Sequence, residues 1–265
     1  MSQFYTSLDN YALLPATLLA LFGCAALLFD FLVFDDASRR KLRPLVVVFA
    51  EIFVGIALYK QQAFLASNGI PNFTGFGGAL TIDGFGLFFN CILAIATLIV
   101  AIVSYKYLEL SGENHTEYYS LLLFAQCGMF FLVTGTDLVT LFIGLELMAL
   151  CFYIMVGFLR TEKRSNEAAI KYLLLGAFSS GFLAYGFSVM YGISGSTRLV
   201  DIARAIAQRP AMDPIVFLAM STTAVGLLFK ISAVPFHMWA PDAYEGAPTT
   251  VTAYLSVASK AASIA

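Results

Sequence analysis

The 265-residue chain is 60% hydrophobic and only 12% charged, its mean hydropathy is +0.82, and its formal net charge is −2. Because an average soluble domain is about half apolar and a quarter charged, this composition indicates a membrane protein. The weak net charge gives no support to nucleic-acid binding. The four cysteines, none in a Cys-x-x-Cys spacing, are expected to be free buried thiols rather than zinc or iron–sulfur ligands.

Apolar stretches follow one another along the chain, and they are long enough to cross a ~30 Å hydrocarbon core as helices. No basic segment or small-residue cleavage site precedes the first, so we interpret it as a retained span rather than a signal peptide. The sequence therefore predicts an all-α polytopic membrane protein. The predicted spans are roughly residues 11–34, 44–64, 85–105, 118–135, 138–159, 168–193, 214–239 and 249–265.

Two connections have a character of their own. Residues 66–83 contain NGIPNFTGFGG, whose Gly, Asn and Pro predict turns or a β-hairpin, and its GFGG at 75–78 fits no nucleotide-binding motif. Residues 197–208 carry apolar side chains on one helical face and charged ones elsewhere, which predicts an amphipathic surface helix. We therefore expect an N-terminal three-helix segment, 1–117, followed by helices four to eight in 118–265.

The charges of the loops predict the orientation of the chain. The loops after spans one, three, five and seven carry 8 Lys or Arg, against 4 for the N-terminus and the remaining loops. By the positive-inside rule, loops 35–43 and 160–167 should face the cytoplasm, with the N-terminus and helix 197–208 on the outer side. Because the last span is still apolar at Ala265, we expect the sequence to be the first part of a longer polypeptide.

Four ionisable residues lie inside the predicted hydrocarbon zone: Glu146, Lys171, Lys230 and Lys260. An ionisable group at the bilayer centre costs about 2.5–3.5 kcal/mol on insertion scales, so four unpartnered groups would cost on the order of 10 kcal/mol. These side chains are therefore expected to face one another or water. Lys230 also lies shortly before Pro235, which interrupts the seventh span, and broken membrane helices usually border a cavity or another protein segment.

Such a group of side chains suits proton transfer and needs no metal or organic cofactor. Burial and a nearby carboxylate act in opposite senses on a lysine's affinity for its proton, so the lysine can exchange a proton near neutral pH. The alternative is a static Glu146–Lys230 bridge that locks two helices together. We favour a relay that includes Lys260 and Lys171, because one carboxylate cannot neutralise three lysines.

The residues around these four have simpler interpretations. His237 is expected either to line water as a proton carrier or to cap a helix, and both remain open. Trp239 is predicted to be an interfacial aromatic residue, and Asp242 and Glu245 to terminate or cap helices near the break. Three other acidic residues lie nearer span ends and are placed at the membrane interface: Asp30, Glu51 and Asp83. A stripe of small residues in the sixth span is interpreted as helix packing: Ala177, Ser180, Gly181 and Ala184.

One stretch, residues 227–262, resembles the signature of the antiporter-like subunits of respiratory complex I; it reads LLFKISAVPFHMWAPDAYEGAPTTVTAYLSVASKAA. Its ending, YEGAPTTVTAYLSVASK, is most similar to subunit N of bacterial NADH:quinone oxidoreductases. The subunits of this family contain two inverted five-helix repeats. The resemblance therefore implies that spans four to eight form the first repeat and that the second repeat is absent from this sequence.

The resemblance also assigns roles to the buried charges. In the family, a glutamate on the fifth span pairs with a lysine on the broken seventh span, and Glu146 and Lys230 fall on these positions. Lys260 matches a lysine on the eighth span of subunit N, where sister subunits often carry histidine. Lys171 matches a lysine on the sixth span. These four residues are thus the implied proton relay.

The implied function is that of a proton-translocating membrane-arm subunit of a NADH:quinone oxidoreductase in the bacterial inner membrane, without redox chemistry of its own. No cofactor is implied for this chain, whereas the complex would use NADH, flavin, iron–sulfur clusters and quinone. The implied partners are other membrane subunits, the lipid bilayer and protons. The alternatives are a subunit of a related multisubunit sodium/proton antiporter or membrane-bound hydrogenase, and a non-transporting membrane scaffold.

Overall fold

Most of the chain is helical. The computed structural model describes residues 6–32, 36–210 and 213–265, and the side chains of these ranges except residues 29–31 and 36–42. In chain order the elements are α1 (Ser7–Leu32), α2 (Asp36–Asn68), β1 (Asn72–Gly75), the 3-10 turn η1 (Phe76–Gly78), β2 (Leu80–Asp83), α3 (Gly84–Ser111), α4 (Thr116–Thr134), α5 (Leu138–Val156), α6 (Lys163–Ser194), α7 (Leu199–Ala207), α8 (Pro214–Lys230), α9 (Trp239–Gly246) and α10 (Thr249–Ile264).

Six of the described helices, α1 to α6, are long and apolar enough to cross a membrane, and α8 is a shorter apolar helix of 17 residues. The predicted all-α membrane fold is confirmed. The predicted break in the seventh span is also present, because α8 ends at Lys230 and α9 begins at Trp239. The segment predicted as a basic loop at 35–43 differs, since α2 already begins at Asp36. The side chains of Asp30 and of the basic residues 39–41 lie outside the described part of the chain.

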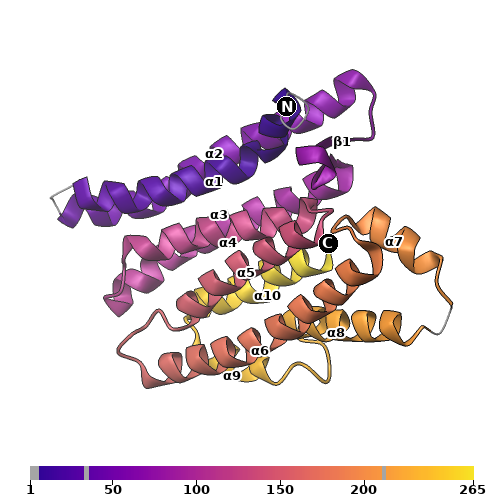
Figure 1. Cartoon of the computed structure of the whole chain (residues 1–265). Coiled ribbons are helices and arrows are strands. Elements are labelled where there is room, and N and C mark those ends of the chain that lie inside the picture. Colours follow the sequence, from indigo (N-terminus) through magenta and orange to yellow (C-terminus); the bar gives the residue numbers. More distant parts are fainter. Residues whose placement is uncertain (1–5, 33–35, 211–212) are drawn as a thin grey trace.

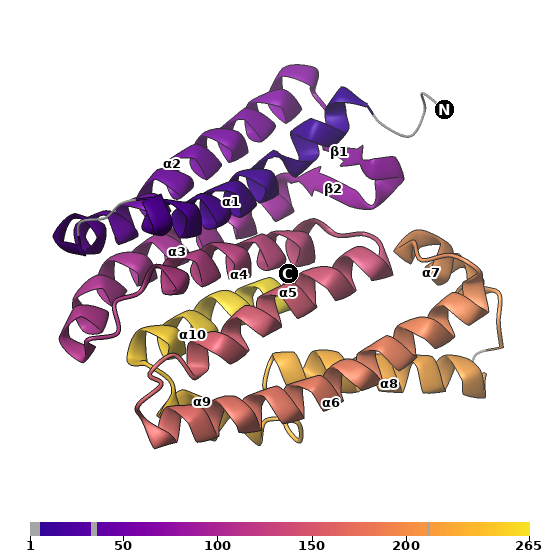
Figure 2. The same cartoon turned by 60° about the vertical axis from the view of Figure 1, so that its left-hand side comes forward.

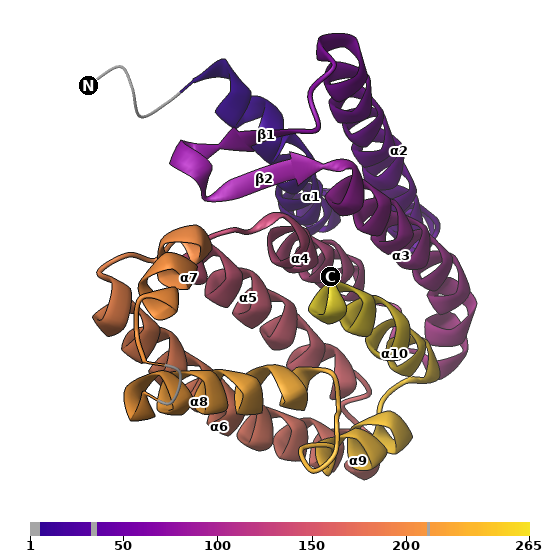
Figure 3. The same cartoon turned by 90° about the vertical axis from the view of Figure 1, so that its right-hand side faces the viewer.

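The helices form a bundle in which α4 and α5 lie near the middle (Figure 1, Figure 2). Helix α4 contacts α1, α2, α3, α5 and α10, and α6 packs against α5, α8 and α9. Figure 3 shows the three-helix layer of α1, α2 and α3 on one side of the bundle and the layer of α6, α8 and α9 on the other. The site described below lies where α5, α6, α8 and α10 approach one another.

Two glycines allow α4 and α5 to approach closely at the centre of this bundle. A Cβ atom added at Gly128 would lie 2.6 Å from the carbonyl oxygen of Gly144, and one added at Gly144 would lie 2.7 Å from Phe131 Cβ. Close backbone approach through small residues is the usual way in which membrane helices pack. The surface of the bundle is correspondingly apolar, with large hydrophobic side chains exposed at positions such as Phe88, Phe178 and Phe217.

The start of α1, the hairpin and α7 lie at one end of the bundle (Figure 1). The hairpin pairs β1 with β2 in antiparallel fashion, with Phe73 opposite Ile82. Thr136, in the turn between α4 and α5, donates its N–H to the Ala79 carbonyl (3.0 Å) and its hydroxyl to the Gly78 carbonyl (2.7 Å). These two hydrogen bonds hold the hairpin against the turn between α4 and α5.

The division of the chain into 1–117 and 118–265 stays a prediction.

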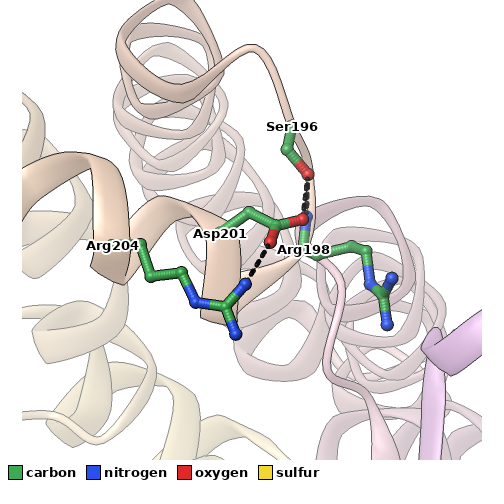
Figure 4. A network of polar contacts seen from close by, with 4 residues as sticks. All are labelled: Ser196, Arg198, Asp201 and Arg204. Atoms are coloured by element: carbon green, nitrogen blue, oxygen red, sulfur yellow. Dashed lines mark hydrogen bonds and ion pairs between the residues drawn. The ribbon is translucent and has the colours of Figure 1, made fainter.

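Helix α7 lies within the predicted amphipathic segment 197–208, and charged contacts fix its first turn (Figure 4). Ser196 Oγ donates to Asp201 Oδ2 (3.0 Å), and Arg204 Nη1 donates to Asp201 Oδ1 (3.4 Å). The Arg198 side chain points away from Asp201 and lies against Gly78 of the hairpin, where a Cβ atom would overlap its guanidinium. This contact joins α7 to the hairpin at the same end of the bundle.

Candidate functional site

The end of α8 is the structural centre of the candidate site. Helix ends leave carbonyl groups without helical partners, and within a membrane these groups need substitutes. Ala233 N–H bonds the Leu228 carbonyl (2.9 Å) and Ser232 N–H bonds the Phe229 carbonyl (3.0 Å), the pattern of a Schellman cap. Ser232 takes the left-handed position of this cap with φ 58°, where glycine is more usual. The polypeptide then runs through Pro235 to α9 without helical structure.

Lys260, on α10, satisfies the last carbonyl of α8. Its Nζ donates to the carbonyl oxygen of Lys230 (2.7 Å) and to Ser232 Oγ (2.6 Å). A cation at a helix C-terminus also interacts favourably with the negative end of the helix dipole. The break in the seventh span and the lysine of the eighth therefore form one unit, in which the ammonium of Lys260 is held beside the backbone of Lys230.

Trp239 is part of this unit, and the prediction that it is an interfacial residue is wrong. It is only 2% exposed, its ring stacks on Tyr172 (centroids 4.5 Å apart) and Phe229 (5.4 Å), and its Nε1–H donates to the Phe229 carbonyl (2.9 Å). Lys260 Nζ lies 4.7 Å from its ring centroid, a cation–π distance. The physical reason is that α9 folds back onto α6, which turns Trp239 into the bundle.

Lys230 itself is buried, with 5% of its surface exposed. Its Nζ donates to the hydroxyl of Tyr153 on α5 (3.4 Å). Glu146 precedes Tyr153 by seven residues on α5, and its carboxylate acts on Lys230 electrostatically. Among the described residues, however, no ion pair within 4.0 Å joins Glu146 to Lys230. The neutral Tyr153 hydroxyl is thus the direct partner of this lysine.

Glu146 has its own polar partner on α6. Ser180 Oγ donates to Glu146 Oε1 (2.5 Å). Ser180 belongs to the stripe of small residues that was interpreted as helix packing. At this position the stripe also supplies a hydrogen-bond donor to Glu146. Another, Gly181, has no atom within 4 Å of its added Cβ and makes no close contact. Glu146, Lys230 and Lys260 therefore lie on three helices around the end of α8.

No contact among the described residues brings Lys171 into this group. It is half exposed and pairs with Glu167 (2.8 Å) on its own helix and with Asp242 (3.0 Å) on α9. Glu245 of α9 similarly lies 3.8 Å from Arg164. Asp242 and Glu245, expected only to cap helices, thus tie α9 to α6. His237 is exposed on the segment between α8 and α9.

A cavity of about 380 Å³ adjoins the lysine. Lys230 and Thr223 of α8 line it, together with Gly135, Leu199 and Ala262 from α4, α7 and α10 or their flanks. Most of its wall is apolar, but the Thr223 hydroxyl is buried without a hydrogen-bond partner among the described residues. Lys230 therefore borders a space that extends toward the end of the bundle that carries α7 and the hairpin.

Sequence reasoning missed Tyr153 and Ser232 as members of the site. Tyr153 follows Glu146 by seven residues, a spacing that places both on one face of a helix and that was available as a signal. No comparable signal marked Ser232, because the bond it receives from Lys260 depends on how α10 packs against α8. Glu51 of α2 was placed at the membrane interface. In the structure its side chain is buried within the bundle, with 7% of its surface exposed, and it contacts Gln126 of α4.

The position of Tyr153 gives a prediction about Gly176 of α6. A Cβ atom at Gly176 would overlap the Tyr153 hydroxyl, so Gly176→Ala should push that hydroxyl away from Lys230. We expect Gly176→Ala to lower the free energy of unfolding of the full-length protein in detergent micelles by about 1–3 kcal/mol, the usual cost of overpacking a buried site. Gly181→Ala, on the same helix with open space around it, is the matched control and should behave as the parent protein. Equal unfolding free energies of the two variants would contradict this placement of the Tyr153 hydroxyl.

Comparisons with known proteins identify related sequences. Residues 135–265 match the family described as NADH:quinone oxidoreductase/Mrp antiporter, transmembrane. The chain is 74% identical over 264 residues to "NADH-quinone oxidoreductase subunit N 2" of Solibacter usitatus, with 100% of this chain and 54% of that protein covered. It is 45% identical over 226 residues to the protein of the same name from Rhizobium meliloti, covering 85% and 46%.

Solved structures show the same fold. A chain of respiratory complex I from Thermus thermophilus superposes with a TM-score of 0.75 at 27% identity, covering 94% of this chain and 51% of that one. A chain of an archaeal membrane-bound sulfane sulfur reductase shares the fold alone, with a TM-score of 0.70 at 19% identity over 95% and 50% of the two chains. The chain spans about half the length of the curated relatives it matches. It belongs to the family of antiporter-like membrane subunits that includes NADH-quinone oxidoreductase subunit N.

Proposed function

We propose that the full-length protein is a proton-translocating membrane-arm subunit of a bacterial NADH:quinone oxidoreductase. The names of the similar proteins and the likeness to a complex I chain support this proposal. The single structural observation that carries it is the contact of Lys260 Nζ with the backbone of Lys230 at the end of a broken helix. That contact brings two lysines from different spans together inside the bundle, where the Glu146 carboxylate acts on Lys230 electrostatically.

The proposed relay consists of Glu146, Lys230 and Lys260. The ammonium groups of Lys230 and Lys260 repel each other, so a proton on one favours release from the other. The carboxylate of Glu146 favours the proton on Lys230, and the Tyr153 hydroxyl offers Lys230 a neutral partner in either state. A change of charge or conformation elsewhere in the complex would then shift protons along this group.

We assign Lys171 a role at the edge of the relay. Its partners Glu167 and Asp242 already balance its charge, and Asp242 belongs to the helix that begins with Trp239, next to Lys260. By holding α9 against α6, Lys171 would position the aromatic surface on which Lys260 lies. The proposed relay therefore contains three of the four residues that the sequence suggested, and Lys171 is left out of it.

The setting of the protein is part of the same proposal. We place it in the bacterial inner (cytoplasmic) membrane, with the N-terminus, the hairpin and α7 on the outer side. Its partners would be the other membrane subunits of the complex, and it would translocate protons without redox chemistry of its own. NADH, flavin, iron–sulfur clusters and quinone would belong to other parts of the complex.

The test is NADH-driven proton uptake by membrane vesicles that carry Glu146→Gln in the full-length protein. The amide keeps the size of the side chain but cannot take up a proton, so we expect uptake to fall at least about tenfold. Glu162→Gln, an exposed position before α6, is the control and should retain full uptake. Normal uptake by a correctly assembled Glu146→Gln complex would remove Glu146 from the relay.

A further inference from the structure

Glu51 of α2 and Gln126 of α4 form a buried polar pair outside the relay. Their exposed fractions are 7% and 3%, and Gln126 Nε2 donates to Glu51 Oε2 (3.2 Å). The other oxygen of each side chain, Glu51 Oε1 and Gln126 Oε1, is buried without a hydrogen-bond partner among the described residues. Buried oxygens are nearly always bonded in native proteins, so two in one contacting pair need an explanation.

No described cation neutralises Glu51, because none of the ion pairs within 4.0 Å in the described part of the chain includes it. On its own helix, Lys60 is exposed and Arg43 bonds the segment between α3 and α4. Tyr254 of α10 interacts with Glu51 electrostatically, but its hydroxyl carries no positive charge. The described charged groups of α1, α3 and α4 lie elsewhere: Asp9 accepts from Phe76 N–H of the hairpin, and Lys106, Glu109 and Glu117 lie near the α3–α4 connection.

An ionised Glu51 would fit this environment poorly. A buried carboxylate normally requires a cation or several hydrogen-bond donors, and one amide N–H is all that the described residues supply. The orphaned oxygen of Gln126 is an acceptor as well, so two acceptors would remain without a donor. A single proton on Glu51 changes this balance, because a protonated carboxyl is itself a donor.

We propose that Glu51 and Gln126 form a proton-binding site, in which Glu51 Oε1 carries a proton at neutral pH and donates it to Gln126 Oε1. The carboxylic acid and the amide then make a ring of two hydrogen bonds, N–H to Oε2 and O–H to Oε1. Both orphaned oxygens are satisfied, and no net charge remains in the membrane. This site lies between the three-helix layer and α4, and its existence does not depend on the proposed function of the relay.

The surroundings favour a proton that stays bound. Val47, Ala50 and Val54 of α2 are buried around Glu51, and Cys127 follows Gln126 with 5% exposure. One turn before Gln126 the Leu122 carbonyl accepts from the Tyr254 hydroxyl (3.4 Å), which is also bonded to Thr97 (2.8 Å). The Tyr254 hydroxyl, the Thr97 hydroxyl and the Leu122 carbonyl are therefore already engaged with one another. They leave Gln126 as the acceptor for the Glu51 proton.

The test is infrared difference spectroscopy of the full-length protein in its complex, reconstituted in lipid at neutral pH. The parent-minus-Glu51→Gln spectrum should contain one C=O stretching band of a protonated carboxyl group that shifts in D₂O. Glu117→Gln, an exposed position at the start of α4, is the matched control and should lack this difference band. If the Glu51→Gln spectrum keeps all protonated-carboxyl bands, Glu51 is ionised and the proposal is wrong.

Two further variants test the pairing with Gln126. The exchange variant Glu51→Gln/Gln126→Glu places the acid on α4, so the band and the amount of assembled complex should both match the parent. In Gln126→Leu the band should move to the frequency of an acid without a hydrogen-bonded partner. Glu51→Gln should assemble in parental amounts, because a second amide makes the same ring. Loss of assembly in that variant, or no band in the exchange variant, would overturn the proposal.

Discussion

Lys230→Met is expected to abolish proton translocation by the assembled full-length protein, and Lys230→Arg is expected to impair it at least about tenfold. Methionine approximates the length of lysine and fills an apolar site, so the bundle should still assemble, but it carries no proton. Arginine keeps the positive charge beside Tyr153 yet cannot readily give up its proton. The measurement is NADH-driven proton uptake by vesicles, with the amount of assembled complex determined separately.

The pair of substitutions separates a relay from a static scaffold. If Lys230 served only as a fixed cation that sets helix positions, arginine would replace it well and methionine would disturb assembly. Lys60→Met, an exposed lysine of α2, controls for the loss of a positive charge from the membrane region. Normal uptake by an assembled Lys230→Met complex would be incompatible with the role proposed for this lysine.

The sequence was sufficient to place the buried charges on helices and to locate the break. A charge within a long apolar run is costly, and proline cannot continue a helix, so Lys230 and Pro235 mark the site without knowledge of the fold. Turn residues likewise predicted the β-hairpin region, and helical periodicity predicted the amphipathic α7. These features depend on neighbouring residues in the sequence, and local rules describe them well.

The partners of the charges could not be predicted in the same way. Trp239 and Asp242 belong to α9, whose direction after the break depends on packing against α6 rather than on its own eight residues. Once α9 folds back, Trp239 meets Tyr172 and Asp242 meets Lys171, which removes Lys171 from the set of unpaired charges. We expected one carboxylate, Glu146, to serve three lysines. That expectation left out Glu167 and Asp242, which pair with Lys171.

Glu51 illustrates a second limit. Its distance from the ends of the predicted span placed it near the interface, but span ends predicted from composition are uncertain by several residues, and burial depends on the neighbouring helix. In the structure α4 brings Gln126 to it across the bundle. Only the pairing of two side chains distant in sequence, with one unsatisfied oxygen on each, shows that this carboxyl differs from an interfacial one.

Trp239→Ala is expected to lower the free energy of unfolding by on the order of 3–5 kcal/mol, the range for removing a large buried aromatic side chain. The substitution removes the ring between Tyr172 and Phe229, the cation–π contact of Lys260 and the donor to the Phe229 carbonyl. Trp239→Phe keeps an aromatic ring and loses mainly the Nε1–H donor, so its cost should be about 1–3 kcal/mol.

The measurement is equilibrium unfolding of the full-length protein in mixed micelles with increasing denaturing detergent. Phe217→Ala is the matched control, because Phe217 is 74% exposed on α8 and its loss removes little buried contact. The expected order of stability is parent and Phe217→Ala first, then Trp239→Phe, then Trp239→Ala. A Trp239→Ala protein as stable as the control would show that α9 does not hold Trp239 inside the bundle, and the position of Lys260 would lose its aromatic support.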